Sequence, residues 1–478
     1  MRDDLSIKLA LRYESRHGLA DCIRSFSLAL TSVQIKLERT SMFVRLRPLG
    51  LGLIVVTVIS LAVGVSRPVR SGNAVADSLR EAGPLKWFRG NLHTHSHWSD
   101  GDDYPEMIAV WYRDKGYDFL VFTDHNTIAD KIRWVEIAHT KGGEAAYEKL
   151  KARFPGDWIE ERNKDNKHEI RLKRFDEVFA KLNEKDKFLV IQGEEISDSF
   201  AKHPIHLNAS NLVRTIPPHG GNSVSETIQN DVNALHAQRE RTRQPMMIHL
   251  NHPNFAWGIT AEDLAPIRGE NFFEVYNGHP TVYNQGDEIH ASTERIWDII
   301  NTRRLSELSL PLLFGLATDD GHSYHNIPSR ASEPGRGWVM VLAEKLDPGA
   351  LIHAMEAGRF YSSSGVTLEQ VALTEKSLEV SVRPDPDATY TIEFIGTRKG
   401  FDPTSEPVVD KAGKSLPVTR KYSKDIGEVL KTVTGTSASY AFSGDELYVR
   451  ARITSSRPHP NPSEIGEPQR AWTQPVTP

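Results

Sequence analysis

The chain has 478 residues and a formal net charge of −5, with 58 Lys and Arg against 63 Asp and Glu. This length allows a large core and two domains, and the mixed charge makes no nucleic-acid partner evident. The one cysteine, Cys22, excludes a framework of disulfides. The sequence has no internal repeat and no Gly-x-Ser-x-Gly sequence that would present a nucleophilic serine.

The amino-terminal part contains an uncharged apolar run over residues 48–66, which follows two arginines and precedes a small-x-small sequence at 74–76. This order is typical of a secretory signal peptide, and the run is also long enough to be an uncleaved membrane anchor. Met42 would be a better start of translation. We therefore expect residues 1–41 to result from a start codon assigned too early or to be a cytoplasmic extension. Residues 42–76 would then be the signal peptide or the membrane anchor. Both alternatives predict an exported protein, periplasmic or membrane-anchored, with its catalytic part outside the cytoplasm.

The next signal is the sequence His93-Thr94-His95. Alternate residues of an extended strand point to the same side, so both imidazoles can face one metal ion. Asp100 adds an oxygen in the turn-forming sequence Ser99-Asp100-Gly101. A second apolar run, residues 119–122, leads directly into His125. Two neighbouring strand ends thus carry metal-ligating side chains, which is the pattern of a multinuclear metal site.

Later apolar runs also end in ligand-type residues, namely 188–191 before Glu194 and Glu195, 246–248 before His249 and His252, 272–276 before His279, and 312–314 before Asp319, Asp320 and His322. Short apolar runs that alternate with amphipathic segments predict parallel strands in a β/α arrangement. In such folds the functional residues gather at the carboxyl ends of the strands. The repeated pattern favours a metal-dependent hydrolase.

These motifs together resemble the PHP superfamily of metal-dependent phosphoesterases, and within it the carbaryl-hydrolase-like metallohydrolases. The resemblance covers residues 86–366 and rests on Gly90 to His95, Ser99 to Gly101, Tyr117 to Phe119, Thr123 to Asn126, Gly193 to Glu195, His206 to Ala209, Asn251 to Pro253, Asp320 to His322 and Gly358 to Gly365. It implies an α/β fold, namely a distorted (β/α)7-type PHP barrel over residues 86–365.

The resemblance also implies nine ligands that hold two or three divalent metal ions. The first ion would be held by the residues that we also expect to carry catalysis, His93, His95, Glu195 and Asp320. Glu195 would bridge to a second ion, completed by His206 and His252. A third ion, where present, would be held by Asp100, His125 and His322. Imidazole and carboxylate ligands suit zinc, manganese and iron equally.

Three neighbouring pairs leave a choice of ligand, and the spacing of the family favours Glu195 over Glu194, Asp320 over Asp319, and His252 over His249. We expect Asp124 to support the site or its turn without binding metal. Other residues have both a functional and a structural explanation. They are His97, His279 and His325 as pocket residues, Arg330, Arg336, Arg359 and Tyr361 as contacts to an anion, and Trp98, Trp257, Tyr276 and Tyr283 as an aromatic pocket.

The chemistry expected of such a site is hydrolysis by a metal-bound hydroxide, while the metals polarise the P=O or C=O of the substrate. The first expectation is a phosphoesterase that acts on a small-molecule ester. One alternative is a carbamate or carboxylic ester hydrolase on the same metal site. Another is a non-catalytic binding module that contains metal. Lys or Arg close to the metals would favour a phosphate, whereas an aromatic pocket would favour an aryl ester.

Three segments outside the ligand motifs carry further expectations. The highly charged residues 141–187 predict a helical insertion, either a solvated face or a lid. From residue 366 the apolar positions alternate, as at Leu378, Val380 and Val382, which predicts an antiparallel β-sandwich-like domain over 366–455. The last residues, 456–478, are rich in Pro and polar side chains, and we expect them to be disordered.

Overall fold

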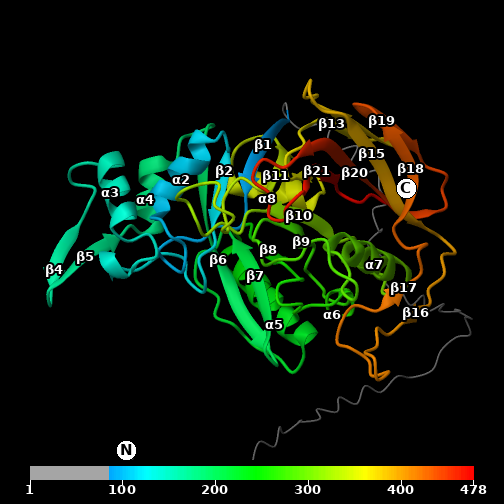
Figure 1. The fold of residues 1–478 in the computed structure, drawn as a ribbon, viewed down its shortest axis with the longest axis horizontal. Coiled ribbons are helices and arrows are strands. Elements are labelled where there is room, and N and C mark those ends of the chain that lie inside the picture. Colours follow the sequence, from blue (N-terminus) through cyan, green and yellow to red (C-terminus); the bar gives the residue numbers. More distant parts are fainter. Residues whose placement is uncertain (1–84) are drawn as a thin grey trace, which may run out of the picture. The chain divides into compact units, whose positions relative to one another are not determined.

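The computed structural model describes residues 85–478, and the structural statements that follow concern that part of the chain (Figure 1). The expectations for residues 1–41 and 42–76, including the apolar run 48–66, lie outside the described residues. None of the helices within residues 85–478 combines the length and the apolar character that a membrane crossing requires.

The central element is a sheet of thirteen strands in the order β10-β9-β8-β7-β6-β2-β1-β11-β12-β21-β20-β15-β18. Its first part consists of β1 (Lys86–Asn91), β2 (Phe119–Phe122), β6 (Leu189–Phe200), β7 (His203–Ser210), β8 (Met247–Leu250), β9 (Phe272–Asn277), β10 (Phe314–Thr318), β11 (Trp338–Ala343) and β12 (Phe360–Ser363). The parallel pairs are β1 with β2, β2 with β6, β8 with β9, and β9 with β10. The predicted mixed α/β fold with a parallel-containing sheet is therefore confirmed.

Strand β7 is an exception to the expected parallel arrangement, because it runs antiparallel to both β6 and β8. The cause is the two-residue connection between β6 and β7. Ala201 and Lys202 have φ values of 48° and 72°, as in the tight hairpin turns that suit the twist of paired strands. The hairpin places residues of β6 and β7 side by side at the same end of the sheet.

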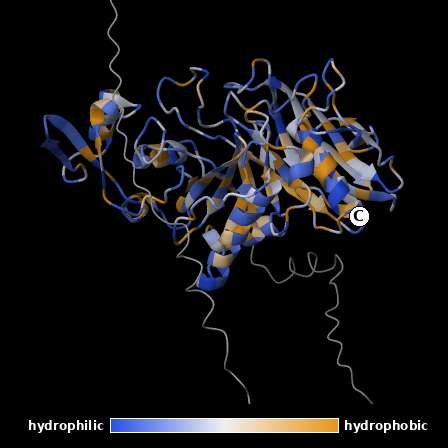
Figure 2. Ribbon diagram, turned by 90° about the horizontal axis from the view of Figure 1, so that it is seen from below, coloured by the Kyte–Doolittle hydropathy of each residue, from blue (hydrophilic) through white to orange (hydrophobic). Residues whose placement is uncertain are grey.

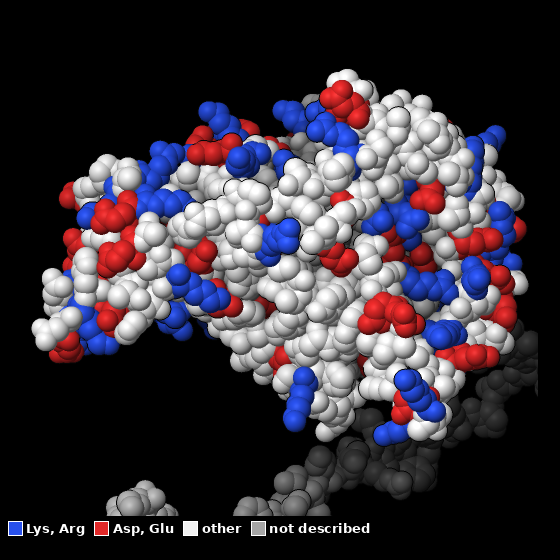
Figure 3. Space-filling view, viewed as in Figure 1, with Lys and Arg blue, Asp and Glu red and all other residues white. Residues whose placement is uncertain are grey.

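An inserted lobe occupies the connection between β2 and β6. It contains β3 (Arg133–Glu136), the short helix η1 (Ile137–His139), α3 (Gly143–Arg153), β4 (Glu161–Lys164), β5 (Lys167–Leu172) and α4 (Phe175–Leu182). The expected helical insertion over 141–187 is wrong in part, because Asp165 and Asn166 form a hairpin turn at positive φ between β4 and β5. The hairpin is strongly hydrophilic (Figure 2), and Lys, Arg, Asp and Glu are interspersed over the lobe (Figure 3).

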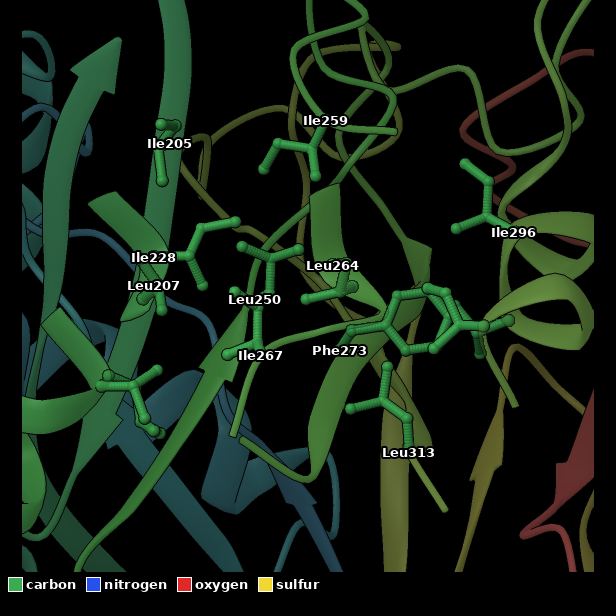
Figure 4. Packing of buried hydrophobic residues seen from close by; sticks show 14 of the residues in the cluster. Ile205, Leu207, Ile228, Leu250, Ile259, Leu264, Ile267, Phe273, Ile296 and Leu313 are labelled. Carbon is green, nitrogen blue, oxygen red and sulfur yellow. The ribbon is translucent and has the colours of Figure 1, made fainter. Parts of the chain in front are cut away.

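Further helices follow or separate the strands, namely α2 (Pro105–Asp114), α5 (Val224–Thr242), α6 (Ala261–Leu264), α7 (Thr293–Ser306) and α8 (Pro348–Glu356). Helix α5 begins at the N-cap Ser223, whose side chain accepts a hydrogen bond from the N–H of Glu226. The helices pack on the strands through large apolar side chains (Figure 4), for example Ile228, Leu264 and Ile296 of the helices and Leu207, Leu250 and Phe273 of the strands. Full burial of such a side chain contributes about 1.5–3 kcal/mol.

The opposite faces of the same strands meet in a second buried cluster. Its strand members include Phe88, Phe119, Val121, Leu189, Ile191, Met247, Phe272, Leu316, Val339 and Val341, and α8 adds Leu351 and Met355. One cluster can join so many strands only if the sheet curves around it. The Ser362 hydroxyl of β12 donates to the carbonyl of Gly315 in β10 over 2.7 Å. Within residues 85–478, however, no strand pairing joins β10 to β11 or β12, so the hydrogen-bonded ring is not closed.

The carboxyl-terminal part has the expected antiparallel strands, β13 (Leu368–Leu373), β14 (Ser377–Val382), β15 (Tyr390–Arg398), β16 (Ser405–Glu406), β17 (Lys421–Tyr422), β18 (Glu428–Thr434), β19 (Ser437–Ala441), β20 (Glu446–Pro458) and β21 (Pro468–Thr473). A small sheet of β13, β14 and β19 shares a buried apolar cluster with β15, β20 and β21 of the large sheet. The expected disorder of residues 456–478 is wrong, because β21 lies between β12 and β20. Trp472 of β21 is 2% exposed.

Candidate metal centre

All nine side chains predicted as ligands lie together at one end of the parallel strands. They form four overlapping groups in which the ligand atoms lie within 4.8 Å of one another, namely His95, Asp100, His125 and His322; His93, His252 and Asp320; His93, His95 and Glu195; and Glu195, His206 and His252. From the sequence we expected Asp320 and His95 to share the first metal ion, and Asp100, His125 and His322 to share the third. The structure adds His95 to the latter group and brings His252 beside His93 and Asp320.

The fold brings these side chains together because most of them follow a strand of the curved sheet, whereas Glu195 and His206 lie within β6 and β7. His93 and His95 come directly after β1, His125 after β2, and His252 after β8. Two parallel bridges beyond the strand ends, Thr94 with Gly321 and His125 with Glu195, tie the loops to one another. The site is thus built from sequence positions more than two hundred residues apart.

Two of these residues have a rare backbone conformation. His252 has a φ of 23° and Asp320 a φ of 50°, although neither is glycine. Such conformations cost energy in other residues and persist where the surrounding structure holds them. The N–H of His252 is fixed by a 2.8 Å hydrogen bond to Oε2 of Glu274. With this backbone conformation, the side chains of His252 and Asp320 both point into the cluster.

Glu195 lies in the middle of the cluster and is 1% exposed. One carboxylate oxygen lies 3.0 Å from Nδ1 of His206 and 3.4 Å from Nε2 of His252. The other lies 2.8 Å from Nδ1 of His125 and 3.4 Å from Nε2 of His95. Nε2 of His93 also lies 3.5 Å from the first oxygen, so the two oxygens face different sets of imidazoles, an arrangement that would let the carboxylate bridge two ions.

The spacing of the remaining ligand atoms fits a metal ion better than direct hydrogen bonds. Oδ1 of Asp320 lies 3.2 Å from Nε2 of His93 and 3.3 Å from Nε2 of His95. Oδ1 of Asp100 lies 3.2 Å from Nε2 of His322 and 3.5 Å from Nε2 of His125. Ligands at about 2.0–2.2 Å from a tetrahedral zinc ion are separated from one another by roughly 3.3–3.5 Å.

Several buried polar atoms in the cluster have no hydrogen-bond partner among the described residues. They are Oδ1 of Asp100, Oε2 of Glu195 and Nδ1 of His206. Unpaired buried polar atoms cost free energy and are rare in folded proteins. Divalent cations held by the groups to which these atoms belong would satisfy all three, so the residues present fit a metal centre.

The electrostatics of the cluster also favour a cation. Burial opposes ionisation of Glu195 and of Asp320, but the surrounding histidines hold the pKa of both carboxyls well below the usual range. Burial, together with the charge of His322, lowers the pKa of His95 to about 3. Burial acts in the same direction on His125, but Glu195 and Asp100 outweigh it and raise its pKa to about 9. Both carboxylates and His95 are therefore in the charge state that binds metal, whereas His125 must release its proton when metal binds.

In each of the three pairs that offered two possible ligands, the structure places only one residue in the cluster. Glu194 points away from the groups and accepts a hydrogen bond from the N–H of Ile216, as the alternation along β6 requires. Asp319 accepts from the hydroxyl of Tyr112 and from the N–H of Gly337. His249 is outside the four groups, with Nε2 at 3.5 Å from Glu274.

Glu274 is the residue of the site that the sequence reasoning missed. Its Oε1 accepts from Nδ1 of His93 at 2.7 Å and from the hydroxyl of Thr318 at 2.7 Å. Its Oε2 accepts from the Asn277 amide at 2.7 Å. The available signal was a single carboxylate inside the otherwise apolar run 272–276. A carboxylate that orients a ligating histidine is a common support of metal sites.

Two other supports hold the ligand loops. Asp124 accepts hydrogen bonds from the N–H and hydroxyl of Ser96 and from the hydroxyl of Ser99, and it is outside the four groups. The expectation that it supports the turn fits this geometry. The amide of Asn251 donates to Oε1 of Glu195 over 2.8 Å and fixes the central carboxylate.

The residues for which the sequence allowed both a functional and a structural explanation differ in how close they lie to the cluster. The ring of His279 lies 5.5 Å from that of His322, beside the cluster, whereas His97 bonds to the carbonyl of Gly101 and His325 to that of Asp102. The others have structural contacts: Arg336 pairs with Glu333, Tyr361 bonds to Leu368, and Trp98 donates to the carbonyl of Lys173. Tyr276 stacks on Trp472, and Trp257 stacks on Tyr283. Within residues 85–478, Arg330 and Arg359 form no ion pair with the nine clustered residues.

No family model matches the sequence, and no curated protein matches it. Among solved structures, the chain is similar to a two-domain protein containing a predicted PHP-like metal-dependent phosphoesterase from Bacteroides vulgatus. The identity is 14%, the match covers 82% of this chain and 96% of that chain, and the TM-score is 0.36.

Two further structures match part of the chain. PsfC from Pseudomonas syringae is 13% identical over 56% of this chain and 88% of its own, with a TM-score of 0.29. A protein designated a metal-dependent phosphoesterase, from Bifidobacterium adolescentis, is 12% identical over 49% of this chain and 87% of its own, with a TM-score of 0.28. Similarities of this size assign no family, so the function must be inferred from the geometry of the site.

Proposed function

We propose that this protein is a metal-dependent phosphoesterase of the PHP type that holds two or three divalent ions with the nine clustered residues. One observation carries the proposal: six histidines and three carboxylates from distant parts of the sequence form four overlapping groups of metal-ligand size. Three buried atoms of this set lack any other partner in the described structure.

The roles of the protein's own residues follow from their contacts. Glu274 accepts the hydrogen bond from Nδ1 of His93, so that Nε2 is the ring nitrogen that faces the cluster. Asn251 and Asp124 fix Glu195 and the loop of His95. When bound, divalent ions would lower the pKa of a coordinated water and withdraw electrons from an ester oxygen. His279 lies beside His322, within reach of a substrate at the cluster.

Turnover of matched esters by the purified full chain tests the proposal. The chain is freed of metal with a chelator, reloaded with zinc or manganese, and mixed with p-nitrophenyl phosphate, bis-p-nitrophenyl phosphate, p-nitrophenyl acetate and a p-nitrophenyl carbamate. We expect metal-dependent release from a phosphate ester, and none from the Asp320→Ala variant. Release from the acetate or carbamate alone would make the protein a carboxylic or carbamic ester hydrolase. Bound metal without turnover of any ester would favour the binding module.

We also propose the subgroup of the protein, the shape of its sheet, the identity of the metal and its export. The likeness of its motifs to the carbaryl-hydrolase-like subgroup supports membership of that subgroup. The buried cluster inside the curved sheet supports a distorted (β/α) barrel. The ligand chemistry supports zinc, manganese or iron. The apolar run 48–66 supports export, with or without a membrane anchor.

A further inference from the structure

One positively charged side chain, that of Lys141, lies directly beside the metal-ligand cluster. Nζ of Lys141 is 3.2 Å from Oδ2 of Asp100, whose other oxygen faces His322 and His125. Within residues 85–478, Lys141 is the one Lys or Arg that forms an ion pair with a carboxylate of the four groups. The ammonium is therefore separated from the candidate metal positions by the width of a single carboxylate.

The ammonium of Lys141 is free to bind a second partner. An ammonium has three N–H donors, and in the described structure Lys141 makes one hydrogen bond, to Asp100. Its side chain is 56% exposed, as expected of a group that meets a ligand from solution. An exposed ion pair with Asp100 would by itself contribute little to stability.

The turn that carries Lys141 is fixed against the site, which an incidental surface lysine does not need. A Cβ on the next residue, Gly142, would lie 2.1 Å from the carbonyl oxygen of Asp102, so glycine allows the two backbones to pack in direct contact. The N–H of Asp102 in turn donates to the carbonyl of His322 over 2.8 Å. The backbone of the lysine turn is thus connected to the backbone of a candidate ligand.

The inserted lobe supplies further anchors for this turn. Lys149 of α3 pairs with Asp103, whose side chain is fully buried. Ile137 of η1 is also fully buried, in the apolar cluster of the lobe. The N–H of Gly143 donates to both the carbonyl and the hydroxyl of Thr140 at 3.1 Å, which closes the turn around Lys141.

We propose that Lys141, held beside the metal centre by the inserted lobe, binds the anionic part of the substrate and selects phosphoesters over neutral esters. This inference rests on the proposed hydrolase function and extends it to the substrate class. An ammonium is a compact cation that pairs with a phosphoryl oxygen by charge-assisted hydrogen bonds. A neutral carboxylic or carbamic ester offers no negative charge for it to pair with.

The first test is binding of inorganic phosphate to the zinc-loaded full chain, measured by titration calorimetry. We expect Lys141→Met to weaken phosphate binding by about tenfold or more, and Lys141→Arg to retain most of it. The matched control is Lys167→Met, because Lys167 is a similarly exposed lysine of the same lobe that pairs with Glu136. The control should bind phosphate as the wild type does. Unchanged binding by Lys141→Met, or no binding by the wild type, would overturn the proposal.

The second test separates substrate binding from a role in holding Asp100. Lys141→Met should lower kcat/KM for bis-p-nitrophenyl phosphate, mainly through KM, and leave that for the neutral p-nitrophenyl acetate unchanged. Its zinc content, measured by mass spectrometry, should equal that of the wild type. Equal losses on both esters, or a loss of zinc, would show that Lys141 only positions Asp100. Failure of the hydrolase proposal would instead appear as no turnover by the wild type, which leaves the phosphate titration informative.

Discussion

Nδ1 of His93 lies 2.7 Å from Oε1 of Glu274, and both side chains are fully buried. The contact joins the end of β1 to the middle of β9, although the two residues are 181 positions apart in the sequence. Because Nδ1 bonds to the carboxylate, Nε2 is the ring nitrogen of His93 that faces Glu195 and Asp320. The geometry of the candidate metal centre therefore depends on a residue outside the nine ligands.

Replacement of Glu274 by Gln should weaken zinc binding by about 10- to 100-fold, because the amide removes the negative charge that orients and polarises His93. Competition with a chromogenic zinc chelator measures this change. The matched control is Glu270→Gln, since Glu270 is equally buried just before β9 and burial raises the pKa of its carboxyl well above the usual range. Glu270 is outside the four ligand groups, so its replacement should leave zinc affinity intact. Equal zinc affinities in both variants would contradict the assigned role of Glu274.

Replacement of His95 by Ala should reduce turnover by about a hundredfold to a thousandfold or more, since it removes a shared member of two ligand groups. His97→Ala is the comparison, because its Nδ1 bonds to the carbonyl of Gly101 and the residue is outside the four groups. That variant should retain turnover. Initial rates on the best ester, with zinc content determined in parallel, measure both effects. A surviving rate in His95→Ala would remove the basis of the enzyme assignment.

The clustering of the nine residues could be predicted from the sequence because most of them follow apolar strands. His93, His125 and His252 each follow such a strand, and these three strands run in the same direction in the sheet, although the antiparallel strand β7 lies between β6 and β8. Glu274 was missed because it lies inside a strand, at a position that the apolar pattern marks as core. Its role depends on β9 lying opposite β1, which no local pattern contains.

The lobe and the carboxyl terminus were predicted less well, for a similar reason. The charged residues 160–174 have the composition of a solvated helix, but the Asp165–Asn166 turn makes them a hairpin. Residues 456–478 have a composition typical of disorder, yet Trp472 stacks on Tyr276 of β9 and β21 pairs with two other strands. Tertiary contacts outweigh local composition in both segments.

Glu106 of α2 should make stability depend on pH. It is 1% exposed, and burial raises the pKa of its carboxyl to about 7. An unfolded chain loses this proton near pH 4.5, whereas the folded chain keeps it up to about pH 7, so the contribution to stability is full below pH 4.5 and is lost as pH rises through 7. The variant Glu106→Gln stays neutral, and its stability relative to the wild type should rise by up to about 3 kcal/mol between pH 4.5 and pH 8.

Urea unfolding of both proteins at pH 5 and pH 8, with zinc present throughout, measures this difference. Other titrating groups affect both proteins equally and cancel in the comparison. A constant difference in the free energy of unfolding across the two pH values would show that Glu106 ionises normally in the folded protein.

The carboxyl-terminal strands should unfold together with the part of the sheet that carries the metal-ligand cluster. Arg450 of β20 is 1% exposed and pairs with Asp298 of α7 at 2.8 Å. Asp298→Ala would leave this buried guanidinium without its main partner and should cost about 3–5 kcal/mol of the free energy of unfolding. The exposed pair of Arg398 with Asp445 gives the control, and Asp445→Asn should cost less than about 1 kcal/mol. Similar losses in the two variants would contradict a structural role for the buried pair.

Zinc-edge anomalous diffraction from crystals of the full chain grown with zinc would locate the metal ions themselves. We expect two or three anomalous peaks among the nine residues, each at about 2.0–2.2 Å from its ligand atoms, with one peak on either side of the Glu195 carboxylate. Asp320→Ala crystals should lose the peak beside His93 and His252. An absence of peaks among these residues, or zinc held elsewhere, would contradict the metal centre and the hydrolase function built on it.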